Sequence, residues 1–148
     1  MARNQNIRWM DGLDGGGLTM ARMTPRQLEK LVAEWQHRLR LDDWDIELVT
    51  IAAATTDYVD NKAGQCYTRS NSRSARIVVA TDGDDPEHTI VHELLHVALH
   101  ECVEAQWRAT AQLGEQAKQV CRDDYDGADE MAVQRLTTAL VQAHRGEN

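Results

Sequence analysis

The chain contains 148 residues, of which 42% are hydrophobic and 27% are charged, a composition typical of one globular domain large enough to bury a core. Its net charge of −8 argues against a general affinity for nucleic acid, because nucleic-acid-binding proteins usually present a basic face to the phosphates. No run of about 18 apolar residues is present, so the sequence predicts no membrane span and no membrane partner.

The N-terminal segment differs from the rest of the chain. It is glycine-rich and has no hydrophobic periodicity, so we expect residues 1–23 to be a flexible leader and residues 24–148 to form a single domain. The three cysteines, Cys66, Cys102 and Cys121, are odd in number and include no C-x-x-C pair, which indicates free thiols in a reducing compartment. Because the N-terminus lacks an apolar signal-peptide segment, the expected location is the cytoplasm.

The first elements of the domain are predicted from helix-start signals and apolar spacing. Thr24 followed by Pro25 is a typical helix start, and apolar residues at helical spacing then predict a helix over residues 25–40. An alternation of apolar and polar residues predicts a half-buried strand over residues 44–54. The polar residues 55–62 are expected to form a loop.

Two more short strands are predicted over residues 63–69 and 74–80, joined by a turn at residues 70–73. We expect the strand over residues 74–80 to be the edge of the sheet on which an extended peptide lies. Main-chain hydrogen bonds at such an edge bind a peptide with little sequence preference.

A helix with strong N-terminal signals follows. Asp85 is a good N-cap, Pro86 suits the first helical position, and Glu87 complements the positive end of the helix dipole. Apolar residues cover so much of this helix that we expect it to be buried in the core. They form two stripes, one of Ile90, Leu94, Val97 and Ala98 and one of Val91, Leu95 and Leu99.

This helix carries the motif H-E-x-x-H at His92, Glu93 and His96. Residues four apart stand one turn apart on the same helical face, so two neutral imidazoles can reach one zinc ion at about 2.0–2.1 Å each. Glu93 is offset around the helix and can act as a general base towards a water on the metal. The alternative is that both histidines are core residues satisfied by hydrogen bonds, since the motif also occurs by chance.

The rest of the chain is predicted to be helical with one interruption. Residues 104–125 have the moderately amphipathic pattern of a helix, or of a helix followed by a loop. The segment from Asp123 to Gly127 is expected to break it. A last helix is predicted over residues 128–143, and the residues expected to face inward are Val133, Leu136, Leu140 and Val141.

A catalytic zinc ion usually has three protein ligands, so a third donor is needed. His100 lies four residues beyond His96, but three side chains at i, i+4 and i+8 of an unbroken helix cannot converge on one ion. We therefore expect His100 at a helix end or on the surface. The last helix offers Glu130, with Asp129 and Asp126 as close competitors and Glu130 having the longest reach. The alternative role for Glu130 is a first-turn acid that complements the helix dipole.

The order of these residues resembles a known peptidase family. The pattern is similar to small phage- and prophage-type zinc peptidases and looks like the gluzincin arrangement in miniature, the minigluzincins. Looser similarity extends to SprT-like and ImmA/IrrE-type metallopeptidase domains. The resemblance covers about residues 25–142, and its specific part is the motif helix. It is carried by Trp44, Ile46, Leu48, Gly64, Ala75, Ile77, the segment Ile90–Val97, Asp129, Glu130, Val133 and Leu136.

The resemblance implies an α+β fold. In it, a small mixed sheet of three to four strands packs against an N-terminal helix, the H-E-x-x-H helix and a C-terminal glutamate helix. It implies His92, His96 and Glu130 as ligands of Zn²⁺ and Glu93 as the general base. SprT-like proteins instead take a third histidine soon after the motif helix, and this chain has none there.

We expect the chain to be a zinc-dependent metallopeptidase that hydrolyses peptide bonds with a metal-activated water. Its substrate would be a peptide or a protein. The resemblance also implies that a phage or prophage encodes it. Tyr125 is a candidate for stabilising the oxyanion, and its alternative role is a packing or turn residue. Two other functions stay open: a metal-binding regulatory or scaffold domain without catalysis, and a zinc hydrolase of a non-peptide amide. The intact Glu93 favours an enzyme.

Overall fold

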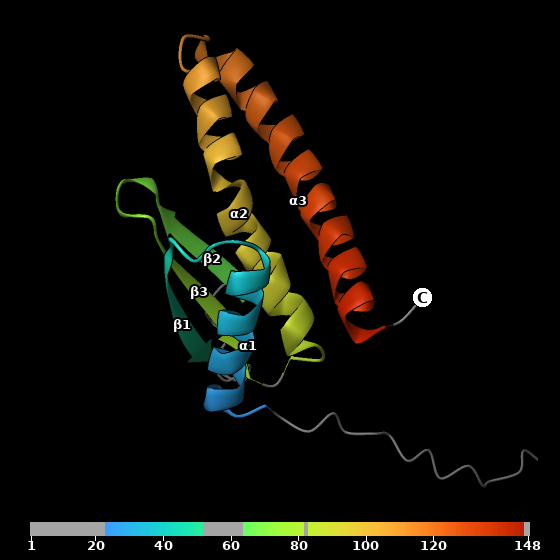
Figure 1. The fold of residues 1–148 in the computed structure, drawn as a ribbon. Helices are drawn as coiled ribbons and strands as arrows, with labels where there is room; N and C mark the ends of the chain where they lie inside the picture. The colour runs from blue at the N-terminus through green and yellow to red at the C-terminus, as the bar shows by residue number, and fades with distance from the viewer. Residues whose placement is uncertain (1–22, 52–63, 82, 147–148) are drawn as a thin grey trace, which may run out of the picture.

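A computed structural model of the chain describes residues 23–51, 64–81 and 83–146 (Figure 1). The predicted α+β fold with a small mixed sheet is confirmed, with three strands and three α-helices among the described residues. Nearly all of the predicted leader and the loop predicted at residues 55–62 lie outside these ranges. The elements are α1 (Pro25–Arg38), β1 (Asp45–Ile51), β2 (Gly64–Arg69), β3 (Ser74–Ala80), α2 (Pro86–Thr110) and α3 (Glu115–Arg145).

Helix α1 begins where the sequence predicted it. The Thr24 hydroxyl accepts a hydrogen bond from the Gln27 backbone amide at 3.3 Å, and the Thr24 amide donates to the Gln27 side chain at 2.8 Å. This capping box satisfies amides that have no partner within the helix. The buried side chains Leu28, Val32 and Trp35 follow at helical spacing and direct one face of α1 into the core.

The sheet has the order β1-β3-β2, with β1 parallel and β2 antiparallel to β3. The prediction that residues 74–80 form an edge is therefore wrong: β3 is the central strand, and β2 is an edge among the described strands. The reason is the composition of β3, since Ala75, Ile77 and Val79 are buried and suit a strand with neighbours on both sides. On the opposite face, Arg76 donates to Glu47 across the β1–β3 pair at 2.7 Å.

Helices α2 and α3 are both longer than predicted and form an antiparallel hairpin (Figure 1). The break expected between Asp123 and Gly127 does not occur, because a helix tolerates one interior glycine at a cost of about 1 kcal/mol. The Gln119 side chain also donates to Asp123 one turn further on, at 2.7 Å. The chain reverses instead at residues 111–114, where Gly114 is the N-cap of α3.

A polar cluster holds the end of α3 against the start of α2. Arg145 donates to both carboxylate oxygens of Asp85, at 2.7 and 3.0 Å, and to Glu87 at 2.8 Å. Glu87 also accepts from the Trp35 indole at 3.0 Å and lies 2.8 Å from His144 Nδ1. We call these five residues the helix-end cluster. It joins all three helices and fixes how α3 lies along α2.

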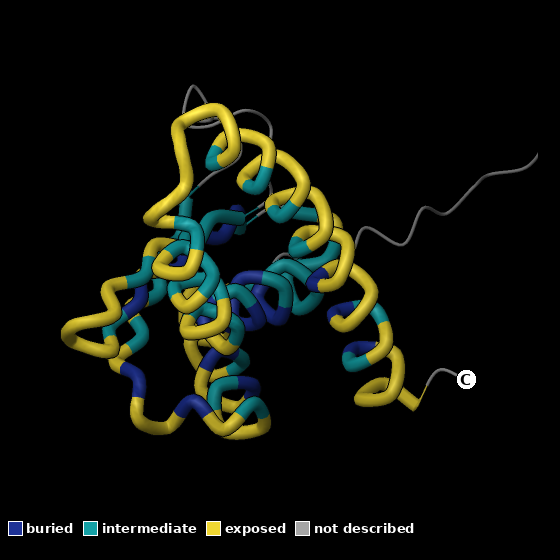
Figure 2. Tube along the Cα trace, turned by 90° about the horizontal axis from the view of Figure 1, so that it is seen from above, coloured by how far each residue is buried: buried dark blue, intermediate teal, exposed yellow. Residues whose placement is uncertain are grey.

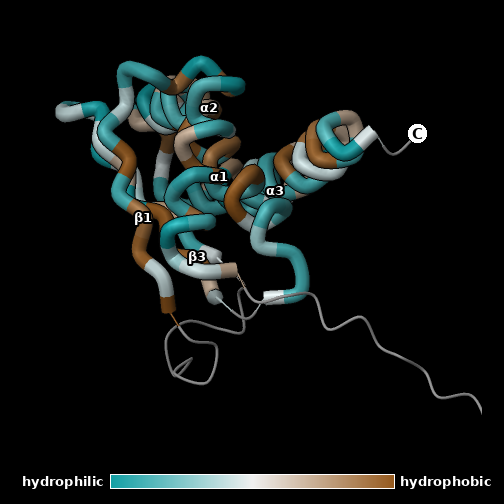
Figure 3. The backbone as a smooth tube through the Cα atoms, turned by 60° about the horizontal axis from the view of Figure 1, so that its bottom comes forward, coloured by the Kyte–Doolittle hydropathy of each residue, from teal (hydrophilic) through white to brown (hydrophobic). Residues whose placement is uncertain are grey.

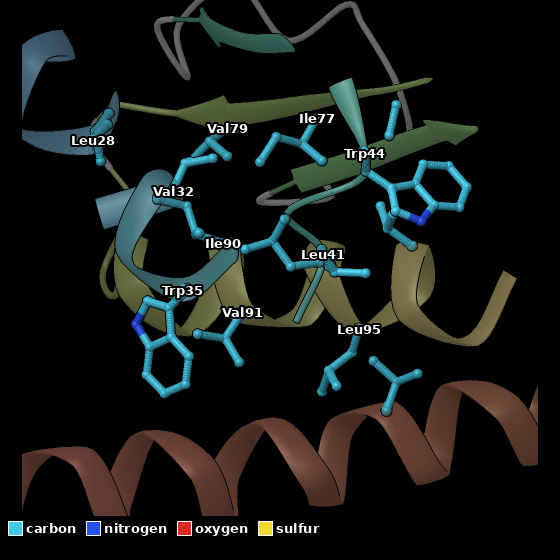
Figure 4. Packing of buried hydrophobic residues seen from close by; sticks show 14 of the residues in the cluster. Leu28, Val32, Trp35, Leu41, Trp44, Ile77, Val79, Ile90, Val91 and Leu95 are labelled. Atoms are coloured by element: carbon cyan, nitrogen blue, oxygen red, sulfur yellow. The ribbon is translucent and has the colours of Figure 1, made fainter. Parts of the chain in front are cut away.

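The core lies between the sheet and the helices. Figure 4 shows the sheet, α2 and α3 as successive layers, with side chains of α1 and α2 packed between them. Figure 2 shows buried positions concentrated in the middle of the molecule, whereas the α2–α3 turn is exposed. Along α3, short hydrophobic stretches interrupt a largely hydrophilic helix (Figure 3). Its only buried side chains are Val133, Thr137 and Val141, which recur every four residues and face α2.

Candidate metal centre

Helix α2 presents His92 and His96 side by side. The Asp85 side chain caps the helix by accepting from the His88 backbone amide at 3.1 Å, and Pro86 occupies the first turn. The two imidazole rings have centroids 4.9 Å apart, and their Nε2 atoms lie 3.2 Å apart. The spacing of four residues therefore brings two nitrogen donors to one point, as the sequence predicted.

Helix α3 brings Glu130 to the same point. Its Oε1 lies 3.3 Å from His96 Nε2, and its Oε2 lies 3.4 Å from His92 Nε2. One donor atom from each of the three residues fits within 4.8 Å of the others. The antiparallel hairpin thus joins residues 34 positions apart in the sequence.

These three donors match what zinc requires. Two imidazole nitrogens and one carboxylate oxygen are typical zinc donors, and three protein ligands leave a fourth position open, as in catalytic sites. Tetrahedral bonds of 2.0–2.1 Å place donor atoms about 3.3 Å apart. His92 Nε2 and His96 Nε2 lie 3.2 Å apart, and Glu130 brings a different oxygen to each, at 3.4 and 3.3 Å; one donor atom from each residue lies within 4.8 Å of the others. The residues present therefore fit a single zinc ion.

The electrostatic environment also suits a metal. Burial lowers the pKa of His92, and the neighbouring His96 lowers it further, while Glu130 acts in the opposite direction. The net effect keeps the imidazole neutral at a pH where an isolated histidine begins to take up a proton. A neutral imidazole is the form that binds a metal.

Asp129 lies behind His96 instead of beside the other donors. Its Oδ2 is 3.4 Å from His96 Nδ1, and its side chain is 16% exposed. An imidazole that donates from Nδ1 keeps its Nε2 lone pair for a metal, and such carboxylate partners orient metal-binding histidines. Of the two competitors to Glu130, Asp129 thus has a supporting position, and Asp126 is exposed and outside the cavity lining.

Glu93 lies in the same cavity as the three donors and is only 6% exposed. The backbone of Gly64 on β2 passes directly over it. A Cβ atom at Gly64 would come within 2.7 Å of Glu93 Oε1 and 2.6 Å of Thr89 Cγ2. Only glycine therefore lets β2 approach this closely. This is the physical basis for a glycine that the sequence pattern singled out.

Cys66, two residues along β2, also faces the cavity. Burial, with a smaller effect of the Glu93 charge, raises the pKa of its thiol to about 12. The thiol therefore stays protonated at neutral pH and contributes a small neutral side chain.

The cavity has a volume of about 530 Å³ and extends beyond the three donors. Sequence analysis missed His88, Thr89 and Gln134, which line this extension. A signal was available: His88 precedes His92 by four residues, and Gln134 follows Glu130 by four residues. Residues four apart share a helical face, so His88 could be predicted to lie on the same side of its helix as His92, and Gln134 on the same side as Glu130.

Two other residues considered from the sequence lie elsewhere. Tyr125 is on α3, more than one turn before Glu130, and is not among the residues that line the cavity; burial and then the charge of Asp129 raise its pKa. His100 is inside α2 and not at its end, because the helix continues to Thr110. Its ring nitrogens lie 2.9 Å from the Thr68 hydroxyl and 2.8 Å from the Ser70 hydroxyl.

Comparison of the chain with protein-family models, curated proteins and solved structures gives no match. Functional inference therefore rests on the residues and geometry of the site. Among the described residues, no helix combines the length and the apolar character needed to cross a membrane.

Proposed function

We propose that this chain is a zinc-dependent metallopeptidase of the small gluzincin-like type that its sequence resembles. The observation that carries the proposal is the meeting of His92, His96 and Glu130 at 3.2–3.4 Å in one cavity with the buried Glu93. Two histidines in an ordinary core need no carboxylate from a second helix at the same point. A general base beside three donors also goes beyond what simple metal binding requires.

The three donor residues would hold the ion, and Asp129 would orient His96 through its Nδ1. When bound, zinc supplies a Lewis acid that polarises a carbonyl and lowers the pKa of a water to about 7. The negative charge of Glu130 and the neutral state of His92 favour retention of a dication.

Glu93 carries the proton. Its carboxylate accepts a proton from the attacking water as the oxygen bonds to the carbonyl carbon. It then donates this proton to the amide nitrogen as the carbon–nitrogen bond breaks, giving a carboxylic acid and an amine. Its 6% exposure and the backbone of Gly64 restrict where the carboxylate can point, so the base is held in one position.

Strand β2 offers a place for an extended substrate. Gly64, Gln65 and Cys66 line the cavity, and no described strand pairs with the outer edge of β2. A peptide that adds to this edge makes main-chain hydrogen bonds and passes the donor residues. Such binding suits a peptide better than a small amide.

The test compares two equivalent changes on α2. Glu93→Gln keeps the size of the side chain but cannot accept a proton, so we expect cleavage of an unstructured protein to fall by about 10²-fold or more. Zinc content should not change. The control is Glu101→Gln, which makes the same change at an exposed position of α2 and should leave cleavage at the wild-type rate.

Two results would contradict the proposal. Glu93→Gln could cleave as fast as wild type, which would exclude Glu93 as the base. Zinc-loaded wild type could cleave none of a broad set of peptides, which would favour a non-catalytic metal-binding domain or a hydrolase of another amide. Mass spectrometry of a peptide library covers both cases, because it detects cleavage without knowledge of the substrate.

A further inference from the structure

The cavity contains a second pair of side chains beside the donor residues. His88 lies one turn before His92 on α2, and Gln134 lies one turn after Glu130 on α3. Both line the cavity, and because the helices are antiparallel both are displaced in the same direction. Four residues correspond to about 6 Å along a helix axis. This is the scale of the separation between a peptide carbonyl and the side chain of an adjacent residue.

The hydrogen bonds around His88 indicate which of its ring nitrogens carries a proton. The Thr138 hydroxyl donates its single proton to the Gln134 carbonyl oxygen at 2.9 Å. It can therefore only accept from His88 Nε2, which lies 3.4 Å away. His88 thus carries a proton on Nε2, the atom that faces α3. The imidazole acts as a hydrogen-bond donor on this side.

Gln134 brings a second polar group to the same place. Its side-chain nitrogen lies 3.5 Å from His88 Nε2, so two N–H groups face a common space. An oxygen atom placed between them can accept from both at ordinary distances of about 2.9 Å. The Gln134 amide also has an oxygen that can accept from an N–H group. The pair therefore complements a group with both an oxygen acceptor and N–H donors.

The charge of the cavity selects an amide over a carboxylate. Among the lining residues that the structure describes there is no lysine or arginine, and the two carboxylates are Glu93 and Glu130. Beside Glu93 and Glu130, a substrate carboxylate would lose water and meet charges of its own sign, which is costly. A side-chain amide is uncharged and avoids this cost. An apolar side chain would offer neither an acceptor to the Gln134 N–H groups nor a donor to its oxygen.

We propose that His88 and Gln134 form a specificity pocket for an asparagine or glutamine side chain next to the cleaved bond. This inference rests on the proposed peptidase function and adds a substrate class to it. His88 and Gln134 determine which peptide is cleaved, whereas Glu93 performs the chemistry.

The first test measures cleavage preference. Peptides that differ only at one position beside the cleaved bond carry Gln, Asn, Glu or Leu there. We expect wild type to favour Gln and Asn by about tenfold in kcat/KM, the scale of one or two net hydrogen bonds. Gln134→Leu and His88→Ala should each abolish most of this preference while Leu peptides are still cleaved. Gln116→Leu, the same change at an exposed position of α3, should keep it.

Two cleavage results would overturn the inference. Wild type could favour Glu or Leu peptides at both positions that flank the bond. Alternatively, the preference for Gln and Asn could persist in both Gln134→Leu and His88→Ala. Either result would show that His88 and Gln134 do not determine which substrate side chain is preferred.

The second test does not depend on cleavage. Zinc-loaded Glu93→Gln is titrated by calorimetry with the Gln and Leu peptides, and the Gln peptide should bind about tenfold more tightly. Adding Gln134→Leu should remove the difference. If wild type cleaves nothing but this difference is present, the peptidase proposal fails and the amide pocket stands. If wild type cleaves peptides but Gln and Leu bind equally, the pocket fails and the peptidase proposal stands.

Discussion

The inner and outer halves of the α2–α3 hairpin have different physical character. In the inner half, residues 86–97 of α2 face residues 129–145 of α3, and all buried side chains of both helices lie here. In the outer half, which comprises residues 98–128, no residue is buried. A stacking contact between Arg122 and Trp107, with the guanidinium 5.0 Å from the ring centroid, is one of the contacts that join the helices there.

This difference explains where the candidate metal centre lies. Donor residues must be held to within a fraction of an ångström, and only packed surroundings restrict side chains this closely. The inner half provides such packing around His92 and His96, which are 19% and 22% exposed, and it ends at the helix-end cluster; Glu130, at 58%, is the exposed member of the set. The outer half extends the helices without buried side chains, so a substitution there should cost less stability than one in the inner half.

The largest expected contrast comes from the same substitution in each half. Leu94→Ala removes a side chain that is fully buried, so we expect the free energy of unfolding to fall by about 2–5 kcal/mol. Leu113→Ala changes a side chain that is 41% exposed and should alter it by less than about 0.5 kcal/mol. Urea denaturation of both variants measures this. Equal losses would show that the outer half is as well packed as the inner half.

The next contrast concerns the support of the donors. Asp129→Asn removes the carboxylate behind His96, and we expect zinc affinity to fall by about 10–100-fold, the usual effect of losing such a partner. Asp126→Asn makes the same change at an exposed outer position and should leave affinity unchanged. Competition with a chromophoric chelator gives both values. Equal zinc affinities of the two variants would show that Asp129 does not support the metal centre.

A smaller effect is expected from pH at the helix-end cluster. Burial acts to raise the pKa of Asp85, but hydrogen bonds from Arg145 and the His88 amide outweigh it and lower the pKa. For Glu87, burial is likewise outweighed by hydrogen bonds led by those from Trp35 and Arg145. A pKa lowered by folding stabilises the protein above the unfolded values of about 4. This stability is lost as the pH falls through the folded values.

Stability in excess chelator should therefore fall as the pH is lowered below about 4, the pKa of free carboxyl groups. Arg145→Gln removes the main partner of both acids, so its stability should depend less on pH over the same range. Thermal melts at closely spaced pH values measure both. Parallel curves for the two proteins would show that the cluster contributes nothing to the pH dependence.

The smallest expected effect has the opposite sign. Gly127 lies inside α3, and a Cβ atom there would meet nothing within 4 Å. Gly127→Ala should therefore stabilise the protein by about 0.5–1 kcal/mol, because alanine loses less backbone entropy in a helix. Gly64→Ala should destabilise it, since its Cβ would collide with Glu93 and Thr89. A destabilised Gly127→Ala would show that the outer half has packing constraints of its own.

The same division decides what the sequence could predict. In the inner half, helix caps, apolar spacing and the four-residue histidine interval all indicated one structure. The start of α2 was therefore predicted correctly, and His92, His96 and Glu130 lie close together in the structure. Glu130 could be selected because a third donor was required and its side chain is long. Predictions from local sequence patterns are correct where burial of the side chains stabilises the predicted structure.

The outer half and the sheet order could not be predicted in this way. Around Asp123 and Gly127, residues with low helix propensity suggested a break, but no competing structure is stabilised there and the helix continues. The central place of β3 depends on pairing between distant segments, which residue alternation does not specify. His88 and Gln134 lie on different helices, so their shared position in the cavity depends on how α2 and α3 pack together.

Metal analysis of the purified protein tests the central claim most directly. Protein prepared without chelator should contain about one zinc ion per chain, and Glu130→Ala should lose most of it, as should His92→Ala and His96→Ala. Excess chelator should also lower the melting temperature, since the ion binds only the folded hairpin. Metal-free wild type after purification in zinc, or full zinc content in Glu130→Ala, would contradict the account.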